Sequence, residues 1–378
     1  MRITAFKGIN NVADRTRLDA GELFEARDVD VGPTGNLLSR EGRTQTMPGA
    51  AHSPYETPFG YLAVVDNDLL LLNAAGALVR VVYDTIGYTR VWYVTFPDGR
   101  VGFSNGLISG IVTATETSAW GVERPIDAGV GIPGEVPYMV TYVRESDGFE
   151  GPPTYGTQNI NTSEAIIGLP TKAGFRINVY LAPYGETMFL AGSTAGDSFQ
   201  YDGAPLTAQH LGSALDAPPP GTLLHAWNSR ILIADGDTVW ATQPMRPELC
   251  DMRSDYFRMP ADITMLYGNG DGLFVGTSEG MYFLAGLVWS KLKAQSVAAG
   301  YVTLGSCVEI DLSYLNEKAR PSGLQQGALC ILDGAVHLIY GAGQINPLSA
   351  GRYHMRADEV YATTRLRNGC LQYLAVPT

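Results

Sequence analysis

The segment Leu223–Thr242 reads LLHAWNSRILIADGDTVWAT and predicts three short strands joined by two tight turns. Asn228-Ser229 and Asp235–Asp237 are the turn residues, because Asn, Asp and Gly accept the backbone conformations that hairpin turns need. The Ile, Leu, Val and Trp residues between them suit pleated, half-buried surfaces. This strand–turn–strand unit is the pattern from which the rest of the fold is predicted.

The same pattern recurs along the chain. Ile263–Leu284 repeats it about 40 residues later, with Gly268–Gly272 as a hairpin turn, and Tyr61–Tyr83 carries an earlier copy. Weaker copies are Ala328–Tyr340 and Val360–Leu374. A spacing of about 40–50 residues with several short strands is typical of a propeller blade, which must stack against neighbours to bury both faces. The sequence therefore predicts an all-β protein with a β-propeller-like body, and an irregular sandwich or barrel is the alternative.

A different sequence pattern interrupts these repeats between Gly121 and Gly203. A segment rich in Pro and Gly, Arg124–Pro137, precedes a Tyr-led strand at Tyr138–Arg144, and another strand is expected at Phe175–Leu181. The order of strands and the Gly-Pro-Pro turn between them resemble a fibronectin type III module, a small β-sandwich. The expected domains are 1–120, an N-terminal segment with the first blades, 121–203, the inserted sandwich, and 204–378, the remaining blades.

Composition and charge narrow the range of functions. The 378 residues include 44 Gly and 22 Pro, which suits short strands and turns, and the formal net charge is −12. A surface that grips nucleic acid needs clustered Lys and Arg, so tight DNA binding is not expected. An acidic wall would still let DNA pass without adhering.

Cysteines and the N-terminus bear on where the protein folds. The four cysteines, Cys250, Cys307, Cys330 and Cys370, lack CxxC spacing and are expected to be buried free thiols, as in a protein folded in the cytoplasm. The start has no signal-peptide pattern, and the longest apolar run is too short to span a bilayer, so no membrane insertion is expected.

Catalytic and metal-binding patterns find little support. His225 and His337 lie in apolar strands, where a hydrogen-bonded core imidazole is expected, and no nucleophile elbow or phosphate loop occurs. Asp residues in the turns, such as Asp235 and Asp237, supply too few oxygens for calcium. The prediction is a protein that is not an enzyme, with no catalytic residues, no cofactor and no metal.

One segment between two predicted blades combines alternating charge with aromatic residues, a mixture that suits a subunit interface. A solvated loop between blades is the alternative. The candidate interface residues are Arg246, Glu248, Asp251, Arg253, Asp255, Tyr256, Phe257 and Arg258.

The N-terminal residues carry a resemblance to a known family. Phe6–Asn11, with the motif Gly-Ile-Asn-Asn, is followed by Gly21–Asp30 and by Gly35–Gly42. This order resembles the N-terminus of bacteriophage tail proteins of the packaged-DNA-stabilisation and tail-nozzle type. Further segments agree with that family in order along the chain, while the region after Leu284 departs from it. These segments are Trp92–Asn105, Ala119–Pro125, Tyr142–Pro153, Trp240–Asp251 and Gly272–Leu284.

The resemblance implies a structural virion protein of the viral tail or head–tail connector, made in the host cytoplasm. It implies self-association into a ring, six-fold in that family, with the portal or adaptor and other tail proteins as partners. DNA would pass through the lumen at ejection and be retained there before it. The Gly-Ile-Asn-Asn segment would close the ring or lace onto a neighbour, and docking on its own domain is the alternative. A propeller-type adhesin that binds a receptor or glycan is the rival function.

Overall fold

The protein is described from a computed structural model, in which residues 7–26, 29–31, 36–39, 49–210, 215–315, 321, 323–355, 357–367 and 370–378 are placed. Strands dominate, and the three helical segments are single 3₁₀ turns: η1 (Arg15–Arg17), η2 (Trp289–Lys291) and η3 (Leu312–Tyr314). The predicted all-β class is confirmed. Across the placed residues, no helix has the length and apolar character needed to cross a membrane.

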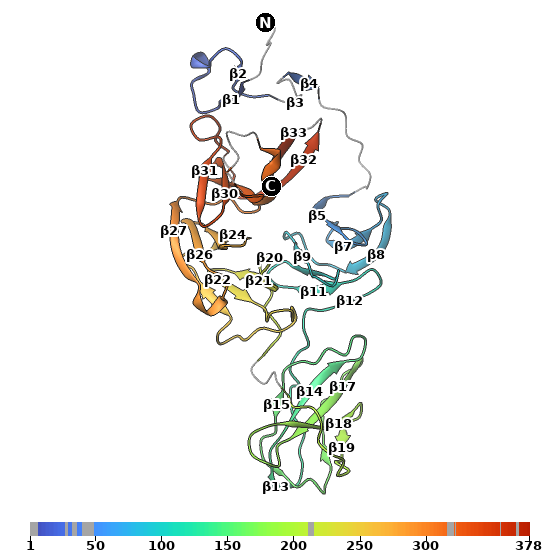
Figure 1. Cartoon of the computed structure of the whole chain (residues 1–378). Helices are drawn as coiled ribbons and strands as arrows, with labels where there is room; N and C mark the ends of the chain where they lie inside the picture. Colours follow the sequence, from blue (N-terminus) through green and yellow to red (C-terminus); the bar gives the residue numbers. More distant parts are fainter. Residues whose placement is uncertain are drawn as a thin grey trace.

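The body consists of five four-stranded antiparallel sheets, each with its strands in chain order, and a final hairpin (Figure 1). The first two sheets are β5 (Ala51–Thr57), β6 (Gly60–Val65), β7 (Asp68–Leu72) and β8 (Leu78–Tyr83), then β9 (Trp92–Thr95), β10 (Val101–Ser104), β11 (Ser109–Val112) and β12 (Thr117–Ala119). The third and fourth are β20 (Leu223–Trp227), β21 (Arg230–Asp235), β22 (Thr238–Ala241) and β23 (Tyr256–Arg258), then β24 (Ile263–Gly268), β25 (Gly272–Thr277), β26 (Gly280–Ala285) and β27 (Lys293–Ala299). The fifth is β28 (Val308–Asp311), β29 (Gln326–Leu332), β30 (Ala335–Tyr340) and β31 (Gln344–Pro347), and the hairpin is β32 (Val360–Arg367) with β33 (Cys370–Pro377).

The third sheet shows why these sequences form blades. The predicted turn residues Asn228 and Ser229 adopt φ of 49° and 62°, the left-handed conformation that a two-residue hairpin needs. Successive residues of a strand face opposite sides of the sheet. In β21, Ile231 and Ile233 therefore pack towards the second sheet, and Leu232 packs towards the fourth. A strand buried on both faces reads as a continuous apolar run, which is what the sequence shows.

Each neighbouring pair of sheets shares a hydrophobic core. One core joins the first and second sheets, a second joins the second and third, and others join the third to the fourth and the fourth to the fifth. The final hairpin packs Leu371 and Tyr373 against the core of the fifth sheet. The sheets thus stack face to face in series, and the body is propeller-like, although the described sheets do not close into a complete propeller (Figure 1).

Arg90 links the second sheet to the end of the chain. Its guanidinium, just before β9, donates to the Val360 carbonyl at 2.6 Å and to Glu359 at 3.1 Å. The same group lies over Trp92 at 4.0 Å and over Tyr361 at 4.2 Å from the ring centroids. These contacts tie the second sheet to the C-terminal hairpin.

A second lobe is inserted between β12 and β20, and we call residues 122–210 the inserted lobe. It has a four-stranded sheet in the order β15 (Thr154–Tyr155), β14 (Tyr138–Arg144), β17 (Phe175–Leu181) and β18 (Phe189–Thr194). A two-stranded sheet of β16 (Ile166–Ile167) and β19 (Ser198–Phe199) lies with it, and β13 (Pro133–Val136) makes isolated bridges to Ile160. Its core is separate from those of the body.

The edges of the inserted lobe lie outside the expected sandwich strands. The Pro- and Gly-rich segment before β14 is part of the lobe, because Ala128 is buried in its core and Gly129 accepts from the Tyr138 hydroxyl at 2.6 Å. At the other end, backbone hydrogen bonds join Ala208 to Leu190 and His210 to Met188, which extends the lobe past Gly203.

The described strands of the N-terminal segment form sheets separate from those of the blades. Strand β1 (Gly8–Ile9) pairs in parallel with β2 (Glu22–Leu23), and β3 (Val29–Val31) pairs with β4 (Leu37–Ser39) as a separate two-stranded sheet.

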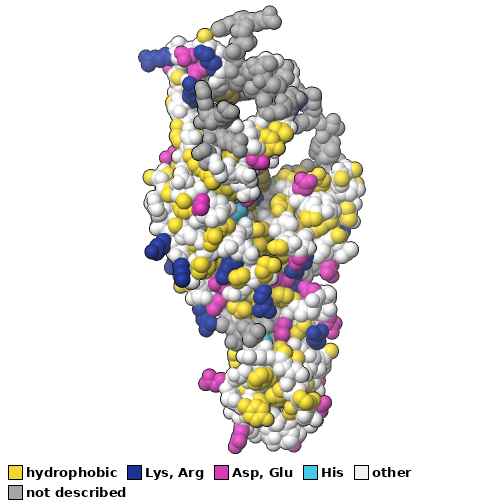
Figure 2. Space-filling model, in the orientation of Figure 1, with side chains coloured by type: hydrophobic (Ala, Val, Ile, Leu, Met, Phe, Trp, Pro, Cys, Tyr) yellow, Lys and Arg dark blue, Asp and Glu magenta, His cyan; other side chains and the backbone are white. Residues whose placement is uncertain are grey.

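Charged side chains are scattered over the face in Figure 2, with basic and acidic groups interleaved.

Candidate functional site

The structure divides the eight predicted interface residues, which lie between β22 and β24, into three groups. Glu248 and Asp255 are buried, Asp251 and Phe257 are half-buried, and Arg246, Arg253, Tyr256 and Arg258 are exposed. Only the exposed group, with the two half-buried residues beside it, is accessible to another subunit. The two buried carboxylates have partners within the same chain.

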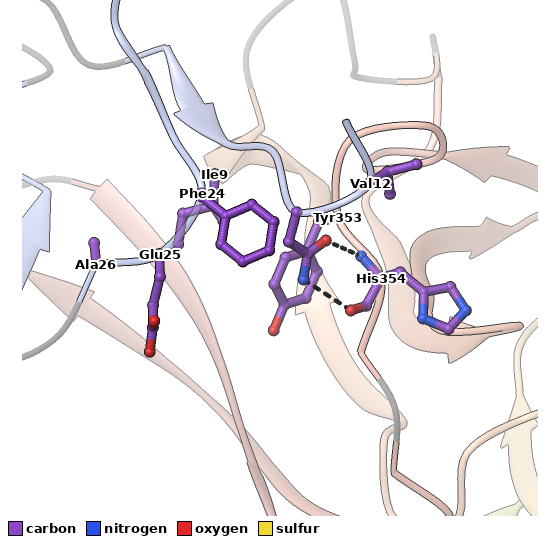
Figure 3. A pocket seen from close by; sticks show the side chains of 8 residues that line it. Ile9, Val12, Phe24, Glu25, Ala26, Tyr353 and His354 are labelled. Atoms are coloured by element: carbon purple, nitrogen blue, oxygen red, sulfur yellow. Dashed lines mark hydrogen bonds between the residues drawn. The ribbon is translucent and has the colours of Figure 1, made fainter. Parts of the chain in front are cut away.

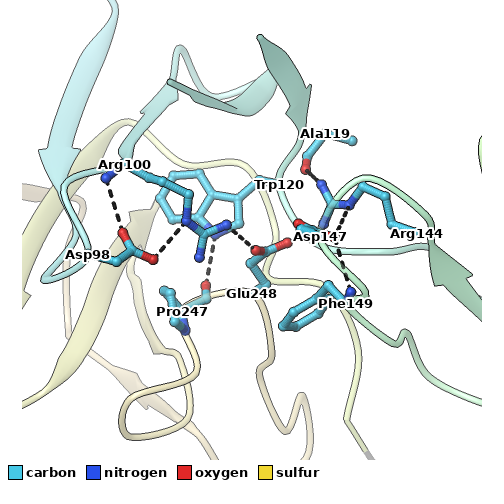
Figure 4. Close-up of polar contacts among 9 residues, drawn as sticks. All are labelled: Asp98, Arg100, Ala119, Trp120, Arg144, Asp147, Phe149, Pro247 and Glu248. Carbon is cyan, nitrogen blue, oxygen red and sulfur yellow. Dashed lines mark hydrogen bonds and ion pairs between the residues drawn. The ribbon is translucent and has the colours of Figure 1, made fainter. Parts of the chain in front are cut away.

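Glu248 connects the body to the inserted lobe (Figure 4). Its side chain is fully buried and accepts from Arg100 of the second sheet at 2.6 Å and from Arg144 at the end of β14. Arg144, itself 7% exposed, also donates to the Ala119 carbonyl at 3.2 Å. Charge-assisted hydrogen bonds of this kind are stronger than neutral ones. One carboxylate therefore joins three parts of the chain: the second sheet, the loop after β22 and the lobe.

Neighbouring contacts reinforce the same junction. Trp120 donates from its indole nitrogen to the Pro247 carbonyl at 2.8 Å, which fixes the backbone beside Glu248 (Figure 4). Gly121 has φ of +85°, and a Cβ there would lie 2.6 Å from the Cβ of Ala217. Glycine is needed at this position because the segments that enter and leave the lobe pass so close together. We call these contacts around Glu248 the lobe junction.

Asp255 organises the loop that carries the exposed interface candidates. It accepts from Arg230 at 3.4 Å, from the Gln243 amide and from the backbone nitrogen of Asp251 at 3.3 Å. On the surface, Arg258 pairs with Asp237 at 2.7 Å and Arg253 with Asp251 at 3.2 Å. Exposed pairs such as these contribute little to stability. The exposed residues of this loop remain candidates for contact with another subunit.

A small polar cavity lies where the first strands of several sheets converge, and we call it the axial pocket. It has a volume of about 170 Å³. Its walls come from β9, β20, β24, β28 and β32 and from the segments just before β9 and β28. The polar lining residues are Arg90, His225, Thr264, Tyr267, Cys307 and Glu309.

His225 and Glu309 face each other across this pocket. The backbone N–H of Gly268 donates to Nε2 of His225 at 2.9 Å, while Nδ1 lies 3.9 Å from Oε1 of Glu309. Burial lowers the pKa of His225 to about 4. The side chain of Glu309 is 66% exposed, and partial desolvation raises its pKa above the usual value. His225 is therefore neutral at pH 7. The hydrogen bond predicted for the imidazole is present, but the ring lines a pocket and is not part of the hydrophobic core. Sequence reasoning missed Glu309, which is 84 residues away in the chain.

The N-terminal segment docks on the body of its own chain (Figure 3). Asn11 accepts from the His354 backbone nitrogen at 2.8 Å, and its amide donates to the His354 carbonyl at 3.0 Å. The Asn11 backbone nitrogen also donates to the Arg352 carbonyl at 2.9 Å. A cavity of about 780 Å³ lies beside this contact, lined by Ile9, Val12, Phe24, Glu25, Ala26 and Tyr353. Docking on the same chain was one of the two arrangements expected for this segment.

The other groups that the sequence singled out are the turn carboxylates and the cysteines. Asp235 and Asp237 flank the turn between β21 and β22, as expected, and Asp237 is paired with Arg258. The described residues include no group of three or more His, Cys, Asp or Glu side chains placed to hold a metal ion. Cys250 and Cys330 are buried free thiols and Cys307 is half-buried, while the side chain of Cys370 lies outside the described residues.

Comparison with known proteins finds solved structures of low similarity and no family. No protein-family model and no curated protein matches the chain. Similar solved structures include BBS1N in complex with ARL6DN (9% identity, 87% of this chain and 91% of that chain covered, TM-score 0.33). Others are virginiamycin B lyase from Staphylococcus aureus (9%, 82% and 87%, 0.31) and BamB from Moraxella catarrhalis (12%, 83% and 76%, 0.30). At identities and TM-scores this low, nothing about the activity of this chain follows from them.

Proposed function

We propose that this protein is a structural subunit of a bacteriophage tail near the head–tail junction, and that copies of it form a ring through which DNA passes. The ordered N-terminal and blade motifs that resemble tail-nozzle proteins suggest the family. The propeller-like body and the inserted lobe are compatible with that suggestion. In this proposal the lobe is a fibronectin type III-like sandwich.

The observation that carries the proposal is the lobe junction. A lobe on a flexible linker would sample many orientations. Here Glu248, in a loop of the third sheet, binds Arg144 of the lobe and Arg100 of the second sheet, and so fixes the lobe to both sheets. A ring subunit needs such a fixed shape, because each copy must present the same surfaces at the same angle to its neighbours. The rigid junction thus supports an assembly role.

The proposed mechanism is geometric and electrostatic, with no bond made or broken. The net charge of −12 favours a lumen that does not hold DNA tightly. Retention of packaged DNA would then come from the width of the channel or from a neighbouring plug. The portal or adaptor above the ring and other tail proteins below it are the proposed partners.

A second candidate function is a receptor-binding adhesin, and the surface of the inserted lobe favours it. Several large apolar side chains of the lobe are exposed, including Tyr184 at 91%, Ile126 at 90% and Ile167 at 61%. Exposed apolar groups of this size suit contact with another molecule. The two functions differ in assembly: a ring subunit forms a closed oligomer, whereas an adhesin of this kind binds its ligand as a monomer.

Electron microscopy of the purified protein and of assembled particles tests the proposal. A closed ring with a central channel and regularly projecting lobes is expected. A monomer that acquires order only when a glycan or receptor is added would instead favour the adhesin.

A further inference from the structure

We infer that the axial pocket binds a small, uncharged polyhydroxy compound, such as a single sugar ring or a polyol, with one hydroxyl held between His225 and Glu309. This inference goes beyond the proposed assembly role and does not depend on ring formation. It rests on three features of the pocket: a fixed imidazole tautomer, a gap of defined width and an unpartnered hydroxyl.

The tautomer of His225 follows from its hydrogen bond. The Gly268 N–H donates to Nε2, so Nε2 is an acceptor and the proton of the neutral ring is on Nδ1. The side chain is only 14% exposed, and its position in β20 fixes the ring. The pocket therefore contains an N–H donor that points towards Glu309.

The gap between His225 and Glu309 is too wide for a direct hydrogen bond. Nδ1 and Oε1 are 3.9 Å apart, while N–H···O bonds are seldom longer than about 3.2 Å. An oxygen placed about 2.8 Å from both atoms would bridge them. A hydroxyl group fits this position because it accepts one hydrogen bond and donates another. An anionic oxygen does not fit, since it has no proton to donate to the carboxylate.

Thr264 supplies a second, independent indication of a ligand. It is 8% exposed and lines the pocket, and its Oγ1 is buried without a hydrogen-bond partner. The pairing of β24 with β25 shifts register between Ile263 and Met265, so Thr264 is the extra residue of a β-bulge. Bulges redirect side chains and are frequent beside functional sites. Leaving a buried hydroxyl without a hydrogen-bond partner costs free energy of folding. A second hydroxyl of the ligand would supply that partner.

The charges around the pocket disfavour anions. Arg90 is already paired with Glu359 and the Val360 carbonyl, which leaves Glu309 as the group of uncompensated charge in the lining. The remaining walls include Trp92, Leu223 and Leu266, which suit the C–H faces of a sugar ring. A compact neutral compound with adjacent hydroxyls matches this combination of donors, acceptor and apolar surface.

Saturation-transfer NMR on the full chain tests the inference with glycerol, D-glucose, D-galactose and N-acetylglucosamine, and with citrate as an anionic probe. At least one polyhydroxy probe is expected to bind with a millimolar or tighter Kd, and citrate is not. The variant Glu309→Gln keeps the shape of the side chain but loses its charge, and should weaken binding about tenfold. Thr264→Val removes the unpartnered hydroxyl without changing the volume, so it should fold normally and bind several-fold more weakly. The matched control is Glu279→Gln, at an exposed turn of the sheet that carries Thr264. This variant should bind as the parent does.

Three results would overturn the inference. The first is that no polyhydroxy probe binds at about 50 mM, far above a millimolar Kd, in which case the pocket holds water only. The second is binding that Glu309→Gln and Thr264→Val leave unchanged, which would place the ligand elsewhere. The third is preferential binding of citrate, which would contradict the charge argument.

Discussion

Arg144 of the inserted lobe is bonded to the buried carboxylate of Glu248, which lies 104 residues later in the chain, in a loop of the body. Both side chains are almost completely shielded from water, at 7% and 0% exposure. Arg144 has a second ion-pair partner, Asp147, 3.4 Å from its Nε, but Glu248 is the fully buried one. The orientation of the lobe and the stability of the body are linked through this one carboxylate.

Loss of the Glu248 charge should destabilise the protein strongly. In Glu248→Gln, Arg144 would lose its buried partner and keep only Asp147, whose side chain is 34% exposed. Breaking a buried pair costs about 3–5 kcal/mol. The matched control is Asp98→Asn, which removes the exposed partner of the same Arg100 (Asp98 is 50% exposed) and should cost less than about 1 kcal/mol. Urea denaturation of both variants gives the two free energies of unfolding. Equal, small losses in the two variants would show that the junction does not hold the lobe.

Stability should fall as the pH is lowered from about 6.5 towards 4, in part because of His225. Its pKa is about 4 in the folded protein and 6.5 in its ordinary state, so the unfolded chain binds a proton in this range that the folded chain does not. This contribution of His225 to the free energy of unfolding is present above pH 6.5 and is lost as the pH falls. It amounts to about 3 kcal/mol. His52 and His210, whose pKa values burial also lowers, act in the same direction, whereas Glu309, with a raised pKa, acts in the opposite one.

The variant His225→Gln isolates this contribution, because its amide oxygen can still accept from Gly268. Its free energy of unfolding, measured in urea at pH 7.0, 5.5 and 4.5, should decline less steeply with pH than that of the parent. Parallel curves for the two proteins would mean that His225 is not buried as a neutral group.

The isolated protein should show negligible affinity for double-stranded DNA. Six copies carrying −12 each would bring −72 to a ring, and DNA binding by counterion release needs clustered Lys and Arg. At about 0.15 M salt, fluorescence anisotropy should give no Kd tighter than about 10⁻⁴ M. Micromolar binding with a steep dependence on salt would instead reveal a basic stripe along the DNA path.

The sequence predicted the blades better than it predicted the sites, for a physical reason. A blade is a local pattern, and residues such as Asn228, Ser229 and the run after Arg230 determine their own hairpin. The lobe junction and the axial pocket are long-range: Glu248 meets Arg100 and Arg144, and His225 meets Glu309, across distances in the chain that no local pattern encodes.

One local signal for Glu248 was nevertheless present. It precedes Leu249 and Cys250, which are 4% and 0% exposed, so its apolar neighbours indicated burial rather than a surface charge. The edges of the lobe were harder to place. Pro- and Gly-rich segments look like linkers in sequence, but Ala128 and Leu206 lie on either side of the expected strands and pack on the lobe core.

Native mass spectrometry, combined with electron microscopy of the same sample, tests the proposed ring most directly. The account predicts one dominant closed oligomer, six 40.6 kDa subunits by the family resemblance, with a central channel and all lobes projecting at the same angle. A protein that remains monomeric at micromolar concentrations and in assembled particles, or whose lobes take many angles relative to the body, would contradict it.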